Sequence, residues 1–134
     1  MGAQQNQPVK TDQIKRLLKR QKGKMKLQLS HCAHCSLCAE SCFLFMANDK
    51  EPEYMPSYKV IYSVGVLYKK RGKVDRAFLE KIKKIVWKNC VLCGRCYCPI
   101  GVDIPGMIAL ARSVCRSQGV HPDFEDPKNP ESWL

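Results

Sequence analysis

The residues with the clearest capacity for chemistry are cysteines, and they fall into two short segments. The chain of 134 residues contains nine cysteines. The first segment, residues 32–42, reads CAHCSLCAESC and has the spacing C-x2-C-x2-C-x3-C. The second, residues 90–99, reads CVLCGRCYCP and repeats the first three steps, but its last two cysteines are separated by one residue. Thiolates at such short spacing are typical metal ligands, so each segment predicts a metal-binding turn.

The number of cysteines in each segment favours four-iron cubanes over a single metal ion. Three cysteines at steps of three wind around one turn and offer three corners of a cubane. In two-cluster ferredoxins the fourth cysteine of such a run ligates the other cluster. We therefore predict two 4Fe-4S clusters with crossed ligation. The first cluster takes Cys32, Cys35, Cys38 and Cys98. The second cluster takes Cys90, Cys93, Cys96 and Cys42.

The shortened step leaves one ligand open. The fourth ligand of the first cluster is Cys98 if the turn is reshaped, and otherwise Cys115. The simpler interpretation of Cys115 is that it is a small buried side chain on a helix and binds no metal. Zinc is the competing metal, but four zinc ligands would leave the third cysteine of each segment unused. We expect His31 and His34 to face solvent or to donate a hydrogen bond to sulfur. We also expect Trp87 to shield the second cluster.

Composition restricts the classes of protein that fit. The formal net charge is +11, and no apolar run approaches the length of a membrane span. The polar first residues do not resemble a signal peptide, so we expect a cytoplasmic protein with reduced thiols. The lysines are scattered over several helices without interleaved aromatic residues, and we therefore predict no nucleic-acid partner. Peripheral membrane association stays open.

Apolar periodicity predicts an all-α fold that positions the two cysteine segments. Helices are expected at residues 11–22, 41–48, 58–70, 74–88 and 103–117, with a loop at 50–57. Thr11 or Asp12 should cap the first helix, Gly23 should end it, and Asp103 should cap the last. The predicted divisions are a tail and short basic helix at 1–24, a cluster-binding domain at 25–119, and an extended tail at 120–134.

These features together resemble the helical-ferredoxin class. The motifs that carry the resemblance are HCSLCAESC at 34–42, CVLCGRC at 90–96 and CPIGVDI at 98–104, and the likeness covers roughly residues 25–118. The class includes the C-type subunit of heterodisulfide reductase and the C-terminal half of the iron–sulfur subunit of succinate dehydrogenase. Two departures from the pattern are Phe43, which follows Cys42 in place of proline, and the shortened second motif.

The resemblance implies a non-catalytic electron-transfer subunit of an oxidoreductase complex, similar to the C-type subunit of heterodisulfide reductase, in sulfur oxidation or other sulfur metabolism. In that family the C-type subunit relays electrons between a flavin-containing subunit and a B-type subunit whose Cys-Cys-Gly motifs hold catalytic clusters. This chain has no adjacent cysteine pair, so its partner should supply them. A hetero-oligomer is expected. The alternatives are a basic zinc or iron–sulfur module for nucleic-acid binding, and a redox sensor.

Overall fold

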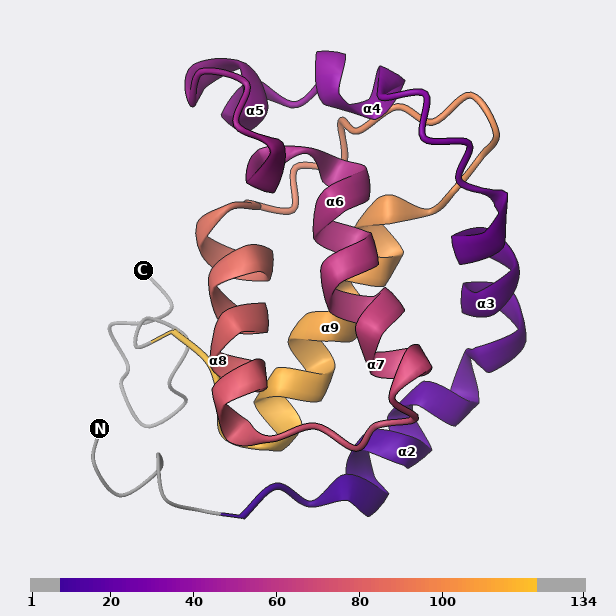
Figure 1. The fold of residues 1–134 in the computed structure, drawn as a ribbon, viewed down its shortest axis with the longest axis vertical. Helices are drawn as coiled ribbons and strands as arrows, with labels where there is room; N and C mark the ends of the chain where they lie inside the picture. Colours follow the sequence, from indigo (N-terminus) through magenta and orange to yellow (C-terminus); the bar gives the residue numbers. More distant parts are fainter. Residues whose placement is uncertain (1–7, 123–134) are drawn as a thin grey trace.

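The computed structural model describes residues 8–122, and within this range the chain is helical, with no strand (Figure 1). This confirms the predicted all-α, helical ferredoxin-like fold. The elements are α2 (Thr11–Arg20), α3 (Lys22–His31), α4 (Leu37–Glu40), α5 (Phe43–Ala47), the 3-10 turn η1 (Pro52–Tyr54), α6 (Pro56–Val60), the π-helical η2 (Ile61–Gly65), α7 (Val66–Lys69), α8 (Arg76–Lys83), the π-helical η3 (Lys84–Lys88) and α9 (Ile104–Ser117). Within the described part of the chain, no helix is both long enough and apolar enough to span a membrane.

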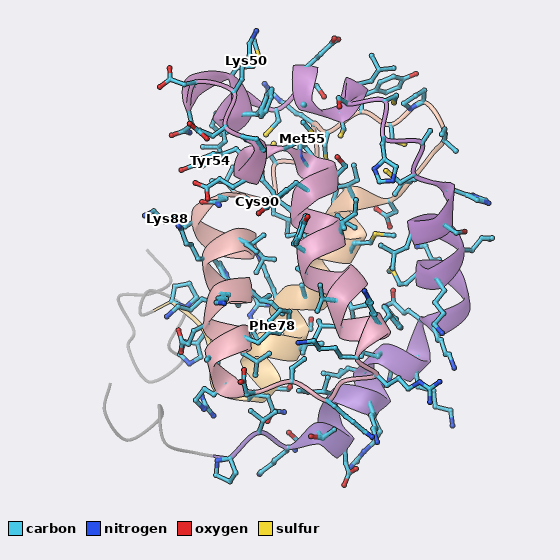
Figure 2. The ribbon with its side chains drawn as sticks, in the orientation of Figure 1. Lys50, Tyr54, Met55, Phe78, Lys88 and Cys90 are labelled. Carbon is cyan, nitrogen blue, oxygen red and sulfur yellow. The ribbon has the colours of Figure 1, made fainter. Side chains whose placement is uncertain are left out.

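Three helical rods form the core of the bundle. One rod runs from α6 through η2 to α7, the second from α8 through η3, and the third is α9 (Figures 1 and 2). Helix α9 buries one face completely, and its buried side chains include Met107, Ile108, Val114 and Cys115. Each such apolar side chain contributes about 1.5–3 kcal/mol when it leaves water. The predicted helices at 58–70 and 74–88 are confirmed, although each contains a π-helical segment.

The N-terminal helices differ from the prediction. Ile14 and Leu18 of α2 are buried, and the Tyr68 hydroxyl donates a hydrogen bond of 2.8 Å to the Leu18 carbonyl. However, the N-cap is Lys10 and makes no side-chain bond, so the predicted caps Thr11 and Asp12 are wrong. Gly23 does not end helical structure either, because it lies inside α3. Helix α3 buries only Met25, and it therefore has no apolar stripe by which to predict it.

Asp103 caps α9 as predicted, and this cap also holds α3. The Asp103 carboxylate accepts a hydrogen bond of 3.0 Å from the Gly106 amide. A Cβ atom at position 106 would collide with that carboxylate, so the cap requires glycine there. From α3, Gln28 accepts a hydrogen bond from the Asp103 amide, and Lys24 pairs with the carboxylate at 3.3 Å. The first turn of α9 and the helix before the first cysteine segment are thereby held together.

Proline and glycine residues mark several of the remaining helix boundaries. Pro52 opens η1 and Pro56 opens α6, so the predicted loop at 50–57 is shorter than expected. Gly72 and Gly119 have positive φ and follow the ends of α7 and α9. The predicted helix at 41–48 is in fact α5, which begins after Cys42. The predicted tails fall mostly on residues 1–7 and 123–134, which lie outside the described residues, and the division at 24 and 119 stays a prediction.

Candidate metal centre

The two cysteine segments lie together at one end of the bundle. Helix α4 lies within the first segment and α5 follows it, and both meet the chain between η3 and α9, which contains the second segment, beyond the end of α6 (Figure 1). One hydroxyl links them: Ser41 donates to the Cys38 carbonyl at 3.2 Å and accepts from the Tyr97 amide at 3.0 Å. Segments that are some 50 residues apart in the sequence therefore share one polar junction.

The backbone of the two segments follows the same unusual path. Two residues after its first cysteine, each segment has a residue with positive φ, namely His34 (54°) and Leu92 (57°). Two residues further on, Ser36 (65°) and Gly94 (76°) have positive φ as well. Alternation of right- and left-handed residues turns successive amides toward one concave side, an arrangement that binds anions, including iron–sulfur clusters. Glycine adopts the positive φ of position 94 without steric cost.

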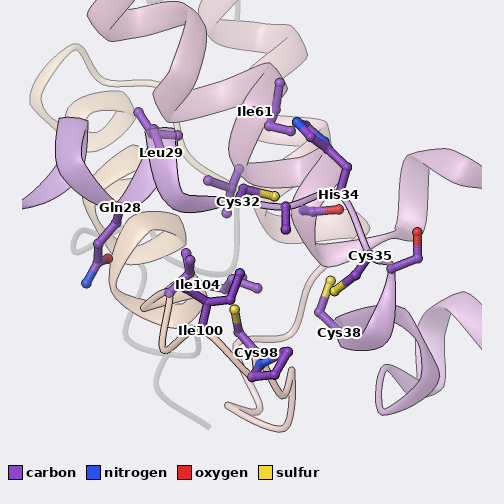
Figure 3. A pocket seen from close by; sticks show the side chains of 16 residues that line it. Gln28, Leu29, Cys32, His34, Cys35, Cys38, Ile61, Cys98, Ile100 and Ile104 are labelled. Carbon is purple, nitrogen blue, oxygen red and sulfur yellow. The ribbon is translucent and has the colours of Figure 1, made fainter.

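The first four predicted ligands line one hollow. This hollow contains about 500 Å³ of space, part of which is open to solvent. Figure 3 shows the sulfur atoms of the labelled cysteines facing the same space, three from the first segment and one from the second. These residues are Cys32, Cys35, Cys38 and Cys98. Leu29, Ile61, Ile100 and Ile104 are among the apolar residues of its wall. The structure thus places Cys98, despite the shortened step, where the crossed arrangement requires it.

The other four predicted ligands line a second hollow. It contains about 410 Å³ of space, part of which is open to solvent, and its cysteines are Cys42, Cys90, Cys93 and Cys96. Again three come from one segment and one from the other. Pro56 and Ile108 contribute to its wall, and so does a lysine, Lys59. Ile104, in the first turn of α9, lines both hollows, so a single side chain forms part of the wall between them.

Burial makes two of these thiols difficult to ionise without a cation. The pKa of Cys96 is raised to about 11, chiefly by burial and in smaller part by the neighbouring sulfurs of Cys90, Cys93 and Cys38. Burial likewise raises the pKa of Cys38, against the effect of hydrogen bonds from Ser57. The influence of Cys38 on Cys96 shows that the two sets of cysteines are electrostatic neighbours. Iron would supply the positive charge that keeps such thiols deprotonated as ligands.

The ninth cysteine lies elsewhere. Cys115 is completely buried, and its thiol points to the Leu79 carbonyl at 3.8 Å. It lines neither hollow, and burial raises its pKa to about 12. Cys115 is thus part of the core between α8 and α9, and Cys98 is the better candidate for the fourth ligand of the first set.

The sequence also singled out two histidines and one tryptophan near the cysteine segments. His34 is exposed and lines the first hollow, whereas His31 ends α3 and is exposed. Trp87 is buried but does not line the second hollow, and its role as a shield of the second cluster stays a prediction. Its ring lies 5.4 Å from the guanidinium carbons of Arg112 and Arg116.

Two residues near the second hollow were not predicted. Arg112 donates to the carbonyls of Val86 at 2.9 Å and Cys90 at 2.8 Å, so α9 holds the start of the second segment. Lys59 is buried on α6 with its Nζ 3.7 Å from the Cys42 sulfur. Neither side chain has a sequence signal, because each contact joins residues far apart in the chain.

The donor set and its surroundings suit a cluster. Four cysteine sulfurs in a partly apolar hollow, beside a backbone concavity that binds anions, are the donors that a 4Fe-4S core requires. In residues 8–122, no group of three or more His, Cys, Asp or Glu side chains has the arrangement of a site for one metal ion. That the eight cysteines ligate iron in two sets of four stays a prediction.

Comparison with known proteins identifies the family. Residues 31–103, more than half of the chain, match the family described as the 4Fe-4S dicluster domain. This match includes both cysteine segments and ends at the cap of α9. No curated protein and no solved structure matches the chain. The chain therefore belongs to the 4Fe-4S dicluster domain family, and it is an iron–sulfur protein that binds 4Fe-4S and acts in electron transfer.

Proposed function

We propose that this protein holds two 4Fe-4S clusters, one in each hollow, and relays electrons between two partner proteins. The observation that carries the proposal is the division of eight cysteines into two sets of four around hollows that share Ile104. With one cluster bound by each set, the two redox centres would be neighbours, with the Ile104 side chain forming part of the wall between them. Such proximity favours transfer of an electron within the chain.

Each set has a side that faces the surface, which a relay requires. Cys35 in the first set and Cys93 in the second are exposed, whereas Cys38 and Cys42 are buried. An electron can therefore enter near one exposed cysteine and leave near the other. The role of the chain is to hold, insulate and tune the clusters. No side chain has to act as an acid or a base for an electron to pass.

Exposed apolar side chains surround the cysteine segments and support docking at this end. Most of the large apolar residues that are exposed belong to these segments or to α5, which follows the first. They are Leu37, Phe43, Met46, Val91, Leu92, Tyr97 and Ile100. Exposed apolar patches commonly mark protein interfaces. A partner seated here would bring its own redox centre close to the clusters.

A basic hollow lies away from the cysteine segments. It is formed by α2, α3 and the end of α7, at the opposite end of the bundle from α4 and α5 (Figure 1), and its cations are Lys15, Lys19, Lys22, Lys26 and Arg71. Such a concentration of charge attracts acidic partners over long range and raises association rates at low salt. We propose that this face steers partners, while the apolar end makes the contact that transfers electrons.

The complex that fits best is similar to heterodisulfide reductase. The motifs at 34–42, 90–96 and 98–104 support a C-type subunit. Because the chain contains no adjacent cysteine pair, a B-type partner with Cys-Cys-Gly motifs would carry the catalytic clusters. A flavin-containing subunit would be the other redox partner. The complex would serve sulfur metabolism, with this chain as its non-catalytic subunit.

Purification of the tagged chain from its native cells under anaerobic conditions tests this assignment. We expect a flavoprotein and a Cys-Cys-Gly protein to copurify. Val91→Asp, which places a charge in the apolar surface, should reduce their recovery at least tenfold. Leu27→Asp is the matched control, since Leu27 is 57% exposed and Val91 55%, but Leu27 lies on α3 outside the cysteine segments. Recovery of neither partner, or equal loss in both variants, would contradict the proposal.

A further inference from the structure

Lys59 is a buried cation beside the second set of cysteines. Only 2% of this residue is exposed, although lysine is among the residues least often buried. Its Nζ lies 3.7 Å from the Cys42 sulfur, and its side chain lines the second hollow with Cys90, Cys93 and Cys96. The lysine therefore ends at the place where cluster ligands gather.

This ammonium group has no carboxylate partner within residues 8–122. The ion pairs found there join Lys24 to Asp103 and Lys83 to Glu80, and neither involves Lys59. A buried charge without a counter-charge is strongly unfavourable. An anionic cluster with thiolate ligands would supply that counter-charge. This step rests on the proposed function, because it requires a cluster in the second hollow.

The first hollow has no equivalent cation. The described residues that line it include no lysine or arginine, and the histidine among them, His34, is exposed. Next to Lys59 in the sequence, Val60 faces this first hollow and adds only apolar surface. Helix α6 thus presents a charge to one set of cysteines and an aliphatic side chain to the other.

We propose that Lys59 raises the reduction potential of the second cluster above that of the first, and so directs electrons from the set containing Cys98 to the set containing Cys42. Reduction adds one electron from a reduced partner, makes the cluster more negative by one charge, and forms or breaks no bond. A cation held nearby in a poorly solvated site stabilises the more negative state. Lys59 is therefore a tuning residue and not a ligand.

Potentiometric titration of the anaerobic holoprotein, followed by electron paramagnetic resonance, tests the proposal. Lys59→Met removes the charge and keeps much of the side-chain length, while Lys59→Arg keeps the charge. Lys69→Met is the control, since it removes an exposed charge from the same rod. We expect two reduction steps in the unmodified protein. Lys59→Met should lower only the higher one, at least tenfold in its equilibrium constant, or about 59 mV for one electron.

The iron content of each variant separates this proposal from the one on which it depends. Fewer than about six irons in the unmodified chain would contradict the two-cluster function itself. With full iron, an unchanged higher potential in Lys59→Met would overturn the role of Lys59. If Lys59→Met loses half its iron and Lys59→Arg does not, the charge is needed to hold the second cluster, which supports the proposal. Equal iron loss in both would reduce Lys59 to a packing residue and overturn it.

Discussion

Replacing Arg112 by methionine should loosen the second cysteine segment more than the rest of the fold. Arg112 is half-buried on α9 and donates to the carbonyls of Val86 and Cys90. Methionine keeps the aliphatic part of the side chain and removes both donors. The two carbonyls then lose their bonds from α9, and the segment loses its attachment at its first cysteine.

The expected loss of stability follows from these contacts. A hydrogen bond from a charged donor contributes about 1.5–3 kcal/mol, and half-burial favours the lower end of that range. Two such bonds give about 3 kcal/mol, and the contact of the guanidinium with Trp87 adds about 0.5–1 kcal/mol. In a chain of this size, the two hydrogen bonds alone, about 3 kcal/mol, correspond to a fall of roughly 10 °C in the melting temperature.

Anaerobic thermal melting of the holoprotein, followed by far-ultraviolet circular dichroism, measures this effect. Lys88→Met is the control, because Lys88 is exposed at the end of η3 and carries the same charge near the same turn. Arg112→Met should melt roughly 10 °C below this control and release the iron of the second cluster first. A melting temperature within about 2 °C of the control would refute the assignment of Arg112 as the anchor of this segment.

Three other sets of variants test the grouping of the cysteines, the Tyr68 hydrogen bond and the burial of Cys115. Because Cys42 and Cys90 line one hollow, replacing both by serine should remove no more iron than either change alone. Cys42→Ser combined with Cys32→Ser, which affects both hollows, should remove nearly all the iron. Additive loss of iron in the first pair would contradict crossed ligation. Tyr68→Phe removes a buried hydrogen bond to α2 and should cost about 1 kcal/mol, measured by urea unfolding; no loss would show that the bond contributes nothing. Burial raises the pKa of Cys115 from 9.0, the value of an unperturbed thiol, to about 12, so its contribution to stability is fully present below about pH 9 and is lost as the pH rises toward 12. The stability difference between the unmodified chain and Cys115→Ala should therefore shrink above pH 9, and a constant difference would show that the thiol is not perturbed.

Helices with a strong apolar stripe could be predicted from the sequence, whereas weakly amphipathic ones could not. The rods at 58–70 and 74–88 repeat buried residues such as Val64, Leu67, Leu79 and Ile82 at helical spacing. Helix α3 buries only Met25, and it is held instead by polar contacts to the cap of α9. Those contacts span more than 70 residues of sequence, and no local pattern predicts them.

The grouping of the cysteines could also be predicted, because the rule that assigns the fourth cysteine to the other cluster depends only on spacing. The shortened step left Cys98 and Cys115 as alternatives. The structure distinguishes them by position, since Cys98 lines the first hollow and Cys115 packs against α8. Lys59 could not be predicted as a site residue. In the sequence it is one lysine among many, and its burial beside Cys42 depends on how α6 packs against α4 and α9.

Whether eight cysteines hold two 4Fe-4S clusters is tested most directly by analysis of iron and acid-labile sulfide, together with electron paramagnetic resonance of the reduced protein. For anaerobically purified chain we predict about eight irons and about eight sulfides per chain, and a reduced spectrum with the magnetic interaction of two neighbouring clusters. About four irons per chain with the spectrum of one isolated cluster, or stoichiometric zinc without sulfide, would contradict the two-cluster assignment.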